Sequence, residues 1–154
     1  MIKKSAGILF TDGKKVLLLR KKSGDDEGIW GLPGGTFEKR DGSVFKTALR
    51  EVKEETGLKK IPGKKIDSVF ENETKCQWTT FIYQIEKPFK ITLSSEHNDY
   101  NWVDLSKLSS VNLHPSFEKH LSQYIEIIKS KFSLSFKEWF FLKECSETIQ
   151  LDKN

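Results

Sequence analysis

The first half of the chain alternates between short apolar runs and polar segments, a pattern typical of strands. Residues 5–11 and 14–20 are two apolar runs on either side of Asp12 and Gly13, a pair suited to a type I′ hairpin turn. Residues 16–19 are all apolar, so we expect the second strand to be covered on both faces. Further strands are predicted at residues 65–70, 77–85 and 100–103.

Two other segments place their apolar residues at helical spacing. Residues 43–56 carry one apolar stripe, with N-cap chemistry at residues 41–43 and Gly57 where a left-handed helix end belongs. A second helix is predicted at residues 116–132. Because one helix lies between strands and the other follows them, the sequence predicts an α/β fold in which helices pack on a mixed sheet.

Composition narrows the class of protein. The length of 154 residues suits one domain, and the 11 Phe, 4 Trp and 3 Tyr residues argue against disorder. The 2 Cys residues exclude a disulfide scaffold and a cysteine-based zinc cluster, which fits a reducing, cytoplasmic setting. No run approaches the roughly 18 apolar residues of a membrane span, so no membrane partner is expected. A net charge of +4 permits a polyanionic ligand without requiring one.

The predicted helix at residues 43–56 carries an arc of acidic side chains. At about 100° per residue, Glu54 and Glu55 lie roughly −60° and +40° from Glu51, beside the apolar stripe. Glu54 and Glu55 occupy the last turn, where the helix dipole disfavours each anion by roughly 0.3–1 kcal/mol. One interpretation is a solvated helix with an Arg50–Glu54 pair. The other is a cation site, and oxygen ligands without Cys or His favour Mg²⁺ or Mn²⁺.

The same segment carries a specific motif. From Arg50 to Leu58 the chain reads Arg-Glu-Val-Lys-Glu-Glu-Thr-Gly-Leu, and Trp-Gly-Leu-Pro-Gly-Gly runs from Trp30 to Gly35. These residues resemble the Nudix box, whose second half they match without exception. Asp41 stands where the pattern has Glu, and eight residues rather than seven separate it from Arg50. We expect Asp41 to cap the helix or brace the loop.

The resemblance implies a Nudix-type α/β/α sandwich with a mixed β-sheet over residues 1–132, followed by an extension at residues 133–154. It also implies metal-dependent hydrolysis of the pyrophosphate bond in a nucleoside diphosphate linked to another moiety, giving a nucleoside monophosphate. In that interpretation the Gly35 carbonyl, Glu51, Glu54 and Glu55 hold Mg²⁺ or Mn²⁺. Arg50 belongs to the catalytic set and orients Glu51 through a salt bridge.

A late loop often supplies a further acid in this family. We favour Glu96, within residues 94–100, as the catalytic base. Glu71, Glu73 and Asp99 remain alternatives. His97 is interpreted as a loop residue rather than a ligand.

Contacts with a substrate are less specific in the sequence. Lys21 and Lys22 end a predicted strand and could meet phosphates, although a solvated strand end explains them equally well. Tyr83 alternates with Trp78 and Phe81 on one strand and could stack on a base, or pack within the sheet.

Three functions stay open. The leading one is a pyrophosphohydrolase of a small-molecule nucleotide such as ADP-ribose, a dinucleoside polyphosphate or an oxidised nucleoside triphosphate. The alternatives are removal of pyrophosphate or a cap from RNA 5′ ends and a non-catalytic nucleotide sensor. In the extension, Phe136, Trp139 and Phe140 share one predicted helical face, to be buried on the same chain or in a homodimer.

Overall fold

The computed structural model describes residues 2–133. The chain divides between Leu121 and Ser122 into two compact units, which are described separately. The first unit contains the whole sheet, and within the second unit residues 122–133 are helical. No helix among the described residues is long and apolar enough to cross a membrane.

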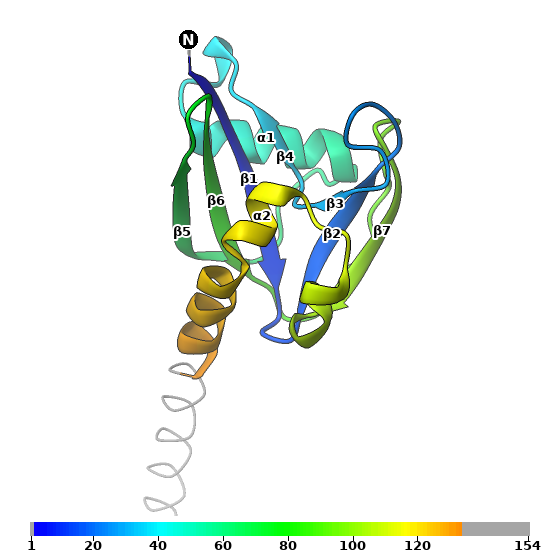
Figure 1. Ribbon diagram of the computed structural model, residues 1–154, viewed down its shortest axis with the longest axis vertical. Helices are drawn as coiled ribbons and strands as arrows, with labels where there is room; N and C mark the ends of the chain where they lie inside the picture. Colours follow the sequence, from blue (N-terminus) through cyan, green and yellow to red (C-terminus); the bar gives the residue numbers. More distant parts are fainter. Residues whose placement is uncertain (1, 134–154) are drawn as a thin grey trace, which may run out of the picture. The chain divides into compact units, whose positions relative to one another are not determined.

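The first unit is built on a mixed sheet of seven strands within the described residues (Figure 1). The strands are β1 (Lys3–Thr11), β2 (Lys15–Lys21), β3 (Trp30–Gly31), β4 (Gly34–Thr36), β5 (Lys64–Asn72), β6 (Cys76–Gln84) and β7 (His97–Asp104). The path β3-β2-β1-β6-β5 forms the centre, while β4 pairs with β1 and β7 pairs with β2. Only β1 and β6 run parallel, so the predicted mixed sheet is confirmed.

The β1–β2 hairpin opens away from its turn. The two strands pair at Thr11 and Val16, after which β1 pairs with β4 and β2 pairs with β7. Gly7 makes the approach of β4 possible, because a Cβ there would lie 2.4 Å from the Pro33 carbonyl oxygen. The opening therefore brings Gly34 and Gly35 of β4 beside the centre of the sheet.

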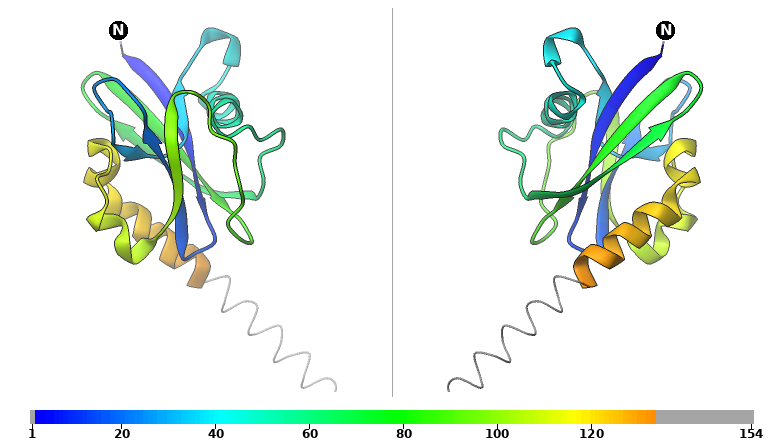
Figure 2. Two further views of the ribbon diagram at one scale, coloured as in Figure 1. Left: turned by 90° about the vertical axis from the view of Figure 1, so that its right-hand side faces the viewer. Right: turned by 90° about the vertical axis from the view of Figure 1, so that its left-hand side faces the viewer.

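Helical segments lie on both faces of the sheet (Figure 2). Helix α1 (Val44–Thr56) packs Ala48 and Val52 against Ile8 and Phe10 of β1 on one face. The 3₁₀ helix η2 (Leu105–Ser110) and the short helix α2 (Pro115–Lys119) lie on the other face, and η1 (Lys39–Asp41) precedes α1. All four residues from Val16 to Leu19 are at most 1% exposed, so the strand covered on both faces is confirmed.

The first turn differs from the sequence expectation. Asp12 has a negative φ and Gly13 a φ of 94°, whereas a type I′ turn needs both to be positive. Instead the Asp12 carboxylate accepts hydrogen bonds from the backbone N–H groups of Lys14 and Lys15, each at 2.9 Å. The side chain of Asp12 thus closes a three-residue loop.

Two further elements differ in their bounds. Strand β7 begins at His97 rather than at residue 100, because it pairs with β2 as far as Lys21. The helix expected at residues 116–132 is interrupted at His120, where α2 ends and a second helical segment, residues 121–133, begins. The predicted aromatic face at residues 136–140 lies outside the described residues.

Candidate functional site

The caps of α1 determine where its acidic residues lie. Ser43 is the N-cap, and its hydroxyl accepts a hydrogen bond from the Lys46 N–H at 3.2 Å. Gly57 ends the helix in the left-handed conformation, with φ 70°, and its N–H donates to the Lys53 carbonyl. Both predicted ends are confirmed, and the three glutamates occupy the second half of the helix.

Arg50 links these glutamates to the loop before the helix. Its Nε and Nη2 donate to the two oxygens of Asp41 at 2.7 and 3.0 Å. Its Nη1 donates to Glu51 at 3.0 Å and to Glu54 at 3.3 Å. A further bond from Nη2 reaches the Thr36 carbonyl at 3.1 Å. The guanidinium therefore joins β4, η1 and two of the acidic residues.

Asp41 braces the loop and anchors Arg50, and it does not cap α1. Its side chain is 3% exposed and accepts hydrogen bonds from the Thr47 hydroxyl and the Glu38 N–H, each at 2.9 Å. Hydrogen bonds from Arg50 hold the pKa of Asp41 well below its usual range, and the same bonds raise the pKa of Arg50. The N-cap of α1 is Ser43 and not Asp41. Of the two expected roles of Asp41, capping the helix or bracing the loop, only bracing agrees with the structure.

Glu51 lies directly against β4. A Cβ at Gly35 would stand 2.3 Å from the Glu51 carboxyl carbon, so only glycine permits this approach. Burial raises the pKa of Glu51, and the neighbouring Arg50 opposes that rise. The Gly35 backbone and the Glu51 carboxylate thus occupy one small volume, as a shared ligand set requires.

Glu55 is the most deeply buried of the three, with its side chain 5% exposed. Its Oε1 accepts a hydrogen bond from the Gly34 N–H at 2.7 Å, and its Oε2 lies 3.4 Å from Nδ1 of His97. Burial raises the pKa of Glu55 to about 8, helped by the charges of Glu51 and Glu96. Glu54, in contrast, has a side chain 53% exposed.

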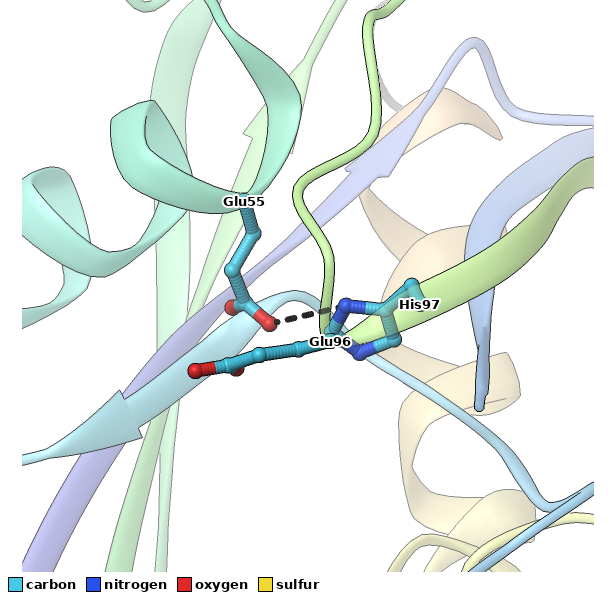
Figure 3. Close-up of side chains that lie close together, drawn as sticks. All are labelled: Glu55, Glu96 and His97. Carbon is cyan, nitrogen blue, oxygen red and sulfur yellow. Dashed lines mark ion pairs between the residues drawn. The ribbon is translucent and has the colours of Figure 1, made fainter. Parts of the chain in front are cut away.

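Glu96, in the turn before β7, and His97, the first residue of β7, bring their side chains close to Glu55 (Figure 3). The Lys22 N–H donates to the Glu96 carbonyl at 3.0 Å, which places the exposed Glu96 side chain at the site. One atom each of Glu55, Glu96 and His97 lie within 4.8 Å of one another. His97 is a buried strand residue rather than the loop residue expected from the sequence, and no local signal distinguishes it.

Of the three predicted substrate contacts, only Lys21 lies beside this group of residues. Lys21 faces His97 across the β2–β7 pair. Burial, and after it the charge of Lys21, lowers the pKa of His97, while the same charge opposes the rise in the pKa of Glu55. The side chain of Lys22 is exposed. Tyr83 is 7% exposed and packs against Phe10 in the core, as the sheet-packing alternative has it.

The three acids considered as alternatives to Glu96 contact residues outside this group. Glu71 accepts a hydrogen bond from the Ser116 hydroxyl of α2 at 2.6 Å, and Glu73 pairs with Lys119 at 3.1 Å. Asp99 lies 3.8 Å from Arg20. Of the four acids considered for the late position, Glu96 is the one grouped with Glu55 in the described part of the chain.

The donor set fits a hard divalent cation. Glu51, Glu54, Glu55 and Glu96 supply carboxylate oxygens, and the charges of Glu51 and Glu96 both disfavour ionised Glu55. A bound cation relieves this repulsion, and oxygen-rich sites suit Mg²⁺ or Mn²⁺. The glycine at position 35 leaves room for backbone and carboxylate oxygens to converge.

The chain is similar to known proteins in sequence and in fold. A family model described as NUDIX domain matches residues 1–125. No curated protein sequence matches the chain. Among solved structures, the chain is similar to the Nudix hydrolase RenU from M. smegmatis, with a TM-score of 0.71 and 22% identity over 82% of this chain and 86% of that one.

Two further structures are similar over most of their lengths. A C. elegans Ap4A hydrolase, solved as a binary complex, has a TM-score of 0.68 and 19% identity over 84% of this chain and 99% of its own. A MutT protein from Methanosarcina mazei Go1 has a TM-score of 0.64 and 28% identity, covering 83% and 96%.

Proposed function

Because this chain belongs to the NUDIX domain family, whose members are hydrolases of pyrophosphate bonds, we propose that it hydrolyses a small nucleotide derivative with a divalent metal ion. The substrate is a nucleoside diphosphate linked to another moiety, and a nucleoside monophosphate is one product. The observation that carries the proposal is the convergence of Gly35, Glu51 and Glu55 on one small volume between α1 and β4.

In this proposal Glu51, Glu54, Glu55 and the Gly35 carbonyl hold Mg²⁺ or Mn²⁺. The metal supplies Lewis-acid stabilisation of the phosphate charge and a water of lowered pKa. Arg50 keeps Glu51 in place through the 3.0 Å contact and is itself held by Asp41. Arg50 stays protonated throughout and so cannot act as a base.

Glu96 is proposed as the general base. Its side chain is exposed and lies beside the buried Glu55, so Glu96 can reach a water molecule at the site. Lys21, whose charge already reaches Glu55 and His97, is positioned to meet a substrate phosphate.

The substrate class is tested with a panel of nucleotides. ADP-ribose, diadenosine tetraphosphate, oxidised nucleoside triphosphates and 5′-triphosphorylated or capped RNA are incubated with the protein, with and without Mg²⁺. We expect a nucleoside monophosphate from a small nucleotide and no product in EDTA. Faster release from RNA ends than from every free nucleotide would favour the RNA alternative, and no turnover of any substrate would favour a sensor.

The metal ligands are tested with Glu54→Gln and Glu55→Gln. Each is expected to lower kcat by at least about 10²-fold, because metal ions supply several kcal/mol of transition-state stabilisation. Glu118→Gln is the matched control, since Glu118 is an exposed carboxylate in α2 on the other face of the sheet. Full activity of either variant in EDTA would contradict the assignment.

A further inference from the structure

We propose that His97 is a positioning residue for Glu55: its Nδ1–H donates a hydrogen bond to Oε2 of the Glu55 carboxylate and holds that carboxylate in one orientation. The inference rests on the proposed function, in which Glu55 is a metal ligand. It adds a role to a residue that the sequence interpretation left in a loop.

The Nδ1 atom of His97 faces the Glu55 carboxylate. It is buried, and among the described residues it makes no hydrogen bond of good geometry. Oε2 of Glu55 lies 3.4 Å from Nδ1, and Figure 3 shows the ring and the carboxylate pointing toward each other. A buried donor without a partner destabilises the fold, so a small tightening of this contact is favourable.

The two oxygens of Glu55 then have one protein donor each. Oε1 already accepts the Gly34 N–H at 2.7 Å, and Oε2 faces His97. A carboxylate offers about four lone-pair sites, so two donors leave it free to bind a cation as well. Donors on both oxygens prevent rotation of the carboxylate, which is how outer residues around metal sites commonly act.

The strand, and not Glu55, holds the imidazole in place. His97 pairs with Lys21 at the first position of β7, and its side chain is 5% exposed. The neighbouring segment is tied to the helix, because the Ser94 N–H donates to the Glu55 backbone carbonyl at 3.2 Å. The donor is therefore in position before any ligand arrives, as a positioning residue should be.

A matched pair of variants separates the donor from the shape of the side chain. In His97→Asn, the side-chain NH₂ group is two bonds from Cβ, as Nδ1 of histidine is, so a donor is kept. In His97→Leu, a side chain of similar size has no donor. Mn²⁺ binding to the full chain is measured without substrate, from the electron paramagnetic resonance signal of free Mn²⁺. We expect His97→Leu to weaken binding by about 10–100-fold. His97→Asn should stay within about threefold of wild type.

The same titration in Glu55→Gln tells the two proposals apart. Glu55→Gln alone should weaken Mn²⁺ binding, and adding His97→Leu should then change it little. If Glu55→Gln binds Mn²⁺ like wild type, the metal assignment fails. If Glu55→Gln weakens Mn²⁺ binding while His97→Leu does not, only the role of His97 is overturned. The same holds if His97→Asn weakens Mn²⁺ binding as much as His97→Leu does. Nitrogen coupling to bound Mn²⁺ would also overturn it, because the imidazole would then be a ligand.

A measurement on the wild-type chain covers the case in which a variant fails to fold. Long-range ¹H–¹⁵N correlation spectra at about pH 8, above the ordinary imidazole pKa of about 6.5, report which ring nitrogen carries the proton. We expect the proton of His97 on Nδ1. His114 is an internal reference, because its Nδ1 accepts a hydrogen bond from the Ser116 N–H and must be unprotonated. A proton on Nε2 of His97 would overturn the proposal.

Discussion

At the scale of single residues, Gly35 is the position where one added methyl group would most directly disturb the site. Its φ is outside the left-handed region, so alanine strains no backbone there, but the new Cβ would stand 2.3 Å from the Glu51 carboxyl carbon. We expect Gly35→Ala to fold and to displace Glu51. A displacement of about 1 Å can lower activity by about 10²-fold, which kcat will show.

Gly31→Ala provides the control for Gly35→Ala. Gly31 also has no positive φ, and a Cβ there would meet only the His114 Cβ, at an ordinary 3.8 Å. This variant should keep both its melting temperature and its kcat. Equal activity of the two variants would mean that the Glu51 position does not matter.

Because Asp41 pairs with Arg50, we expect the free energy of unfolding to depend on pH. Arg50 lowers the folded-state pKa of Asp41 below its unfolded value of about 3.9, so the stabilisation is complete above that pH and is lost as the pH falls below about 4. We expect Asp41→Asn to be less stable than wild type at pH 7. Urea unfolding should show the difference narrowing between about pH 4 and pH 3. A constant difference over that range would contradict the ion pair.

At the scale of elements, the proposed base lies immediately before β7. The backbone of Glu96 is held by the Lys22 N–H, while its side chain is exposed, so Glu96→Gln should leave the strand intact. We expect kcat to fall by about 10²-fold with a smaller change in KM, since general base catalysis contributes about that much. Asp99→Asn, in the strand that follows Glu96, should keep its rate because Asp99 pairs with Arg20.

An unchanged rate in Glu96→Gln would place the base elsewhere. Glu71 and Glu73 are poor replacements, since both contact residues of α2 on the sheet face opposite α1. Helix α1 carries the proposed metal ligands, the proposed base Glu96 immediately precedes β7, and His97 begins that strand, so the relative placement of α1 and β7 defines the candidate site.

At the scale of the whole molecule, the sequence after residue 132 leads to a prediction about the oligomeric state. The sequence places Phe136, Trp139 and Phe140 on one predicted helical face, and such a face must be covered. We expect it to be covered by the same chain, so the intact protein should sediment as a monomer. A dimer that dissociates in Trp139→Ala/Phe140→Ala, with a folded monomer, would instead establish self-association through this face.

The sequence by itself determined α1 and its acidic arc. The caps Ser43 and Gly57 act within one helical turn, and the spacing of Glu51, Glu54 and Glu55 follows from residues per turn. The helical spacing also places Glu55 nearest the apolar stripe, and in the structure Glu55 is the most buried of the three glutamates. Local geometry depends on neighbours in sequence, which is why it could be predicted.

Tertiary structure alone decided how these residues are held. The Gly34–Glu55 bond joins positions 21 residues apart, and the Glu55–His97 contact depends on the register in which β7 pairs with β2. Tyr83 turned into the core because the parallel pairing of β6 with β1 aligned it beside Phe10. Periodicity describes faces within one element, but which faces meet depends on how strands from distant parts of the chain pair and pack.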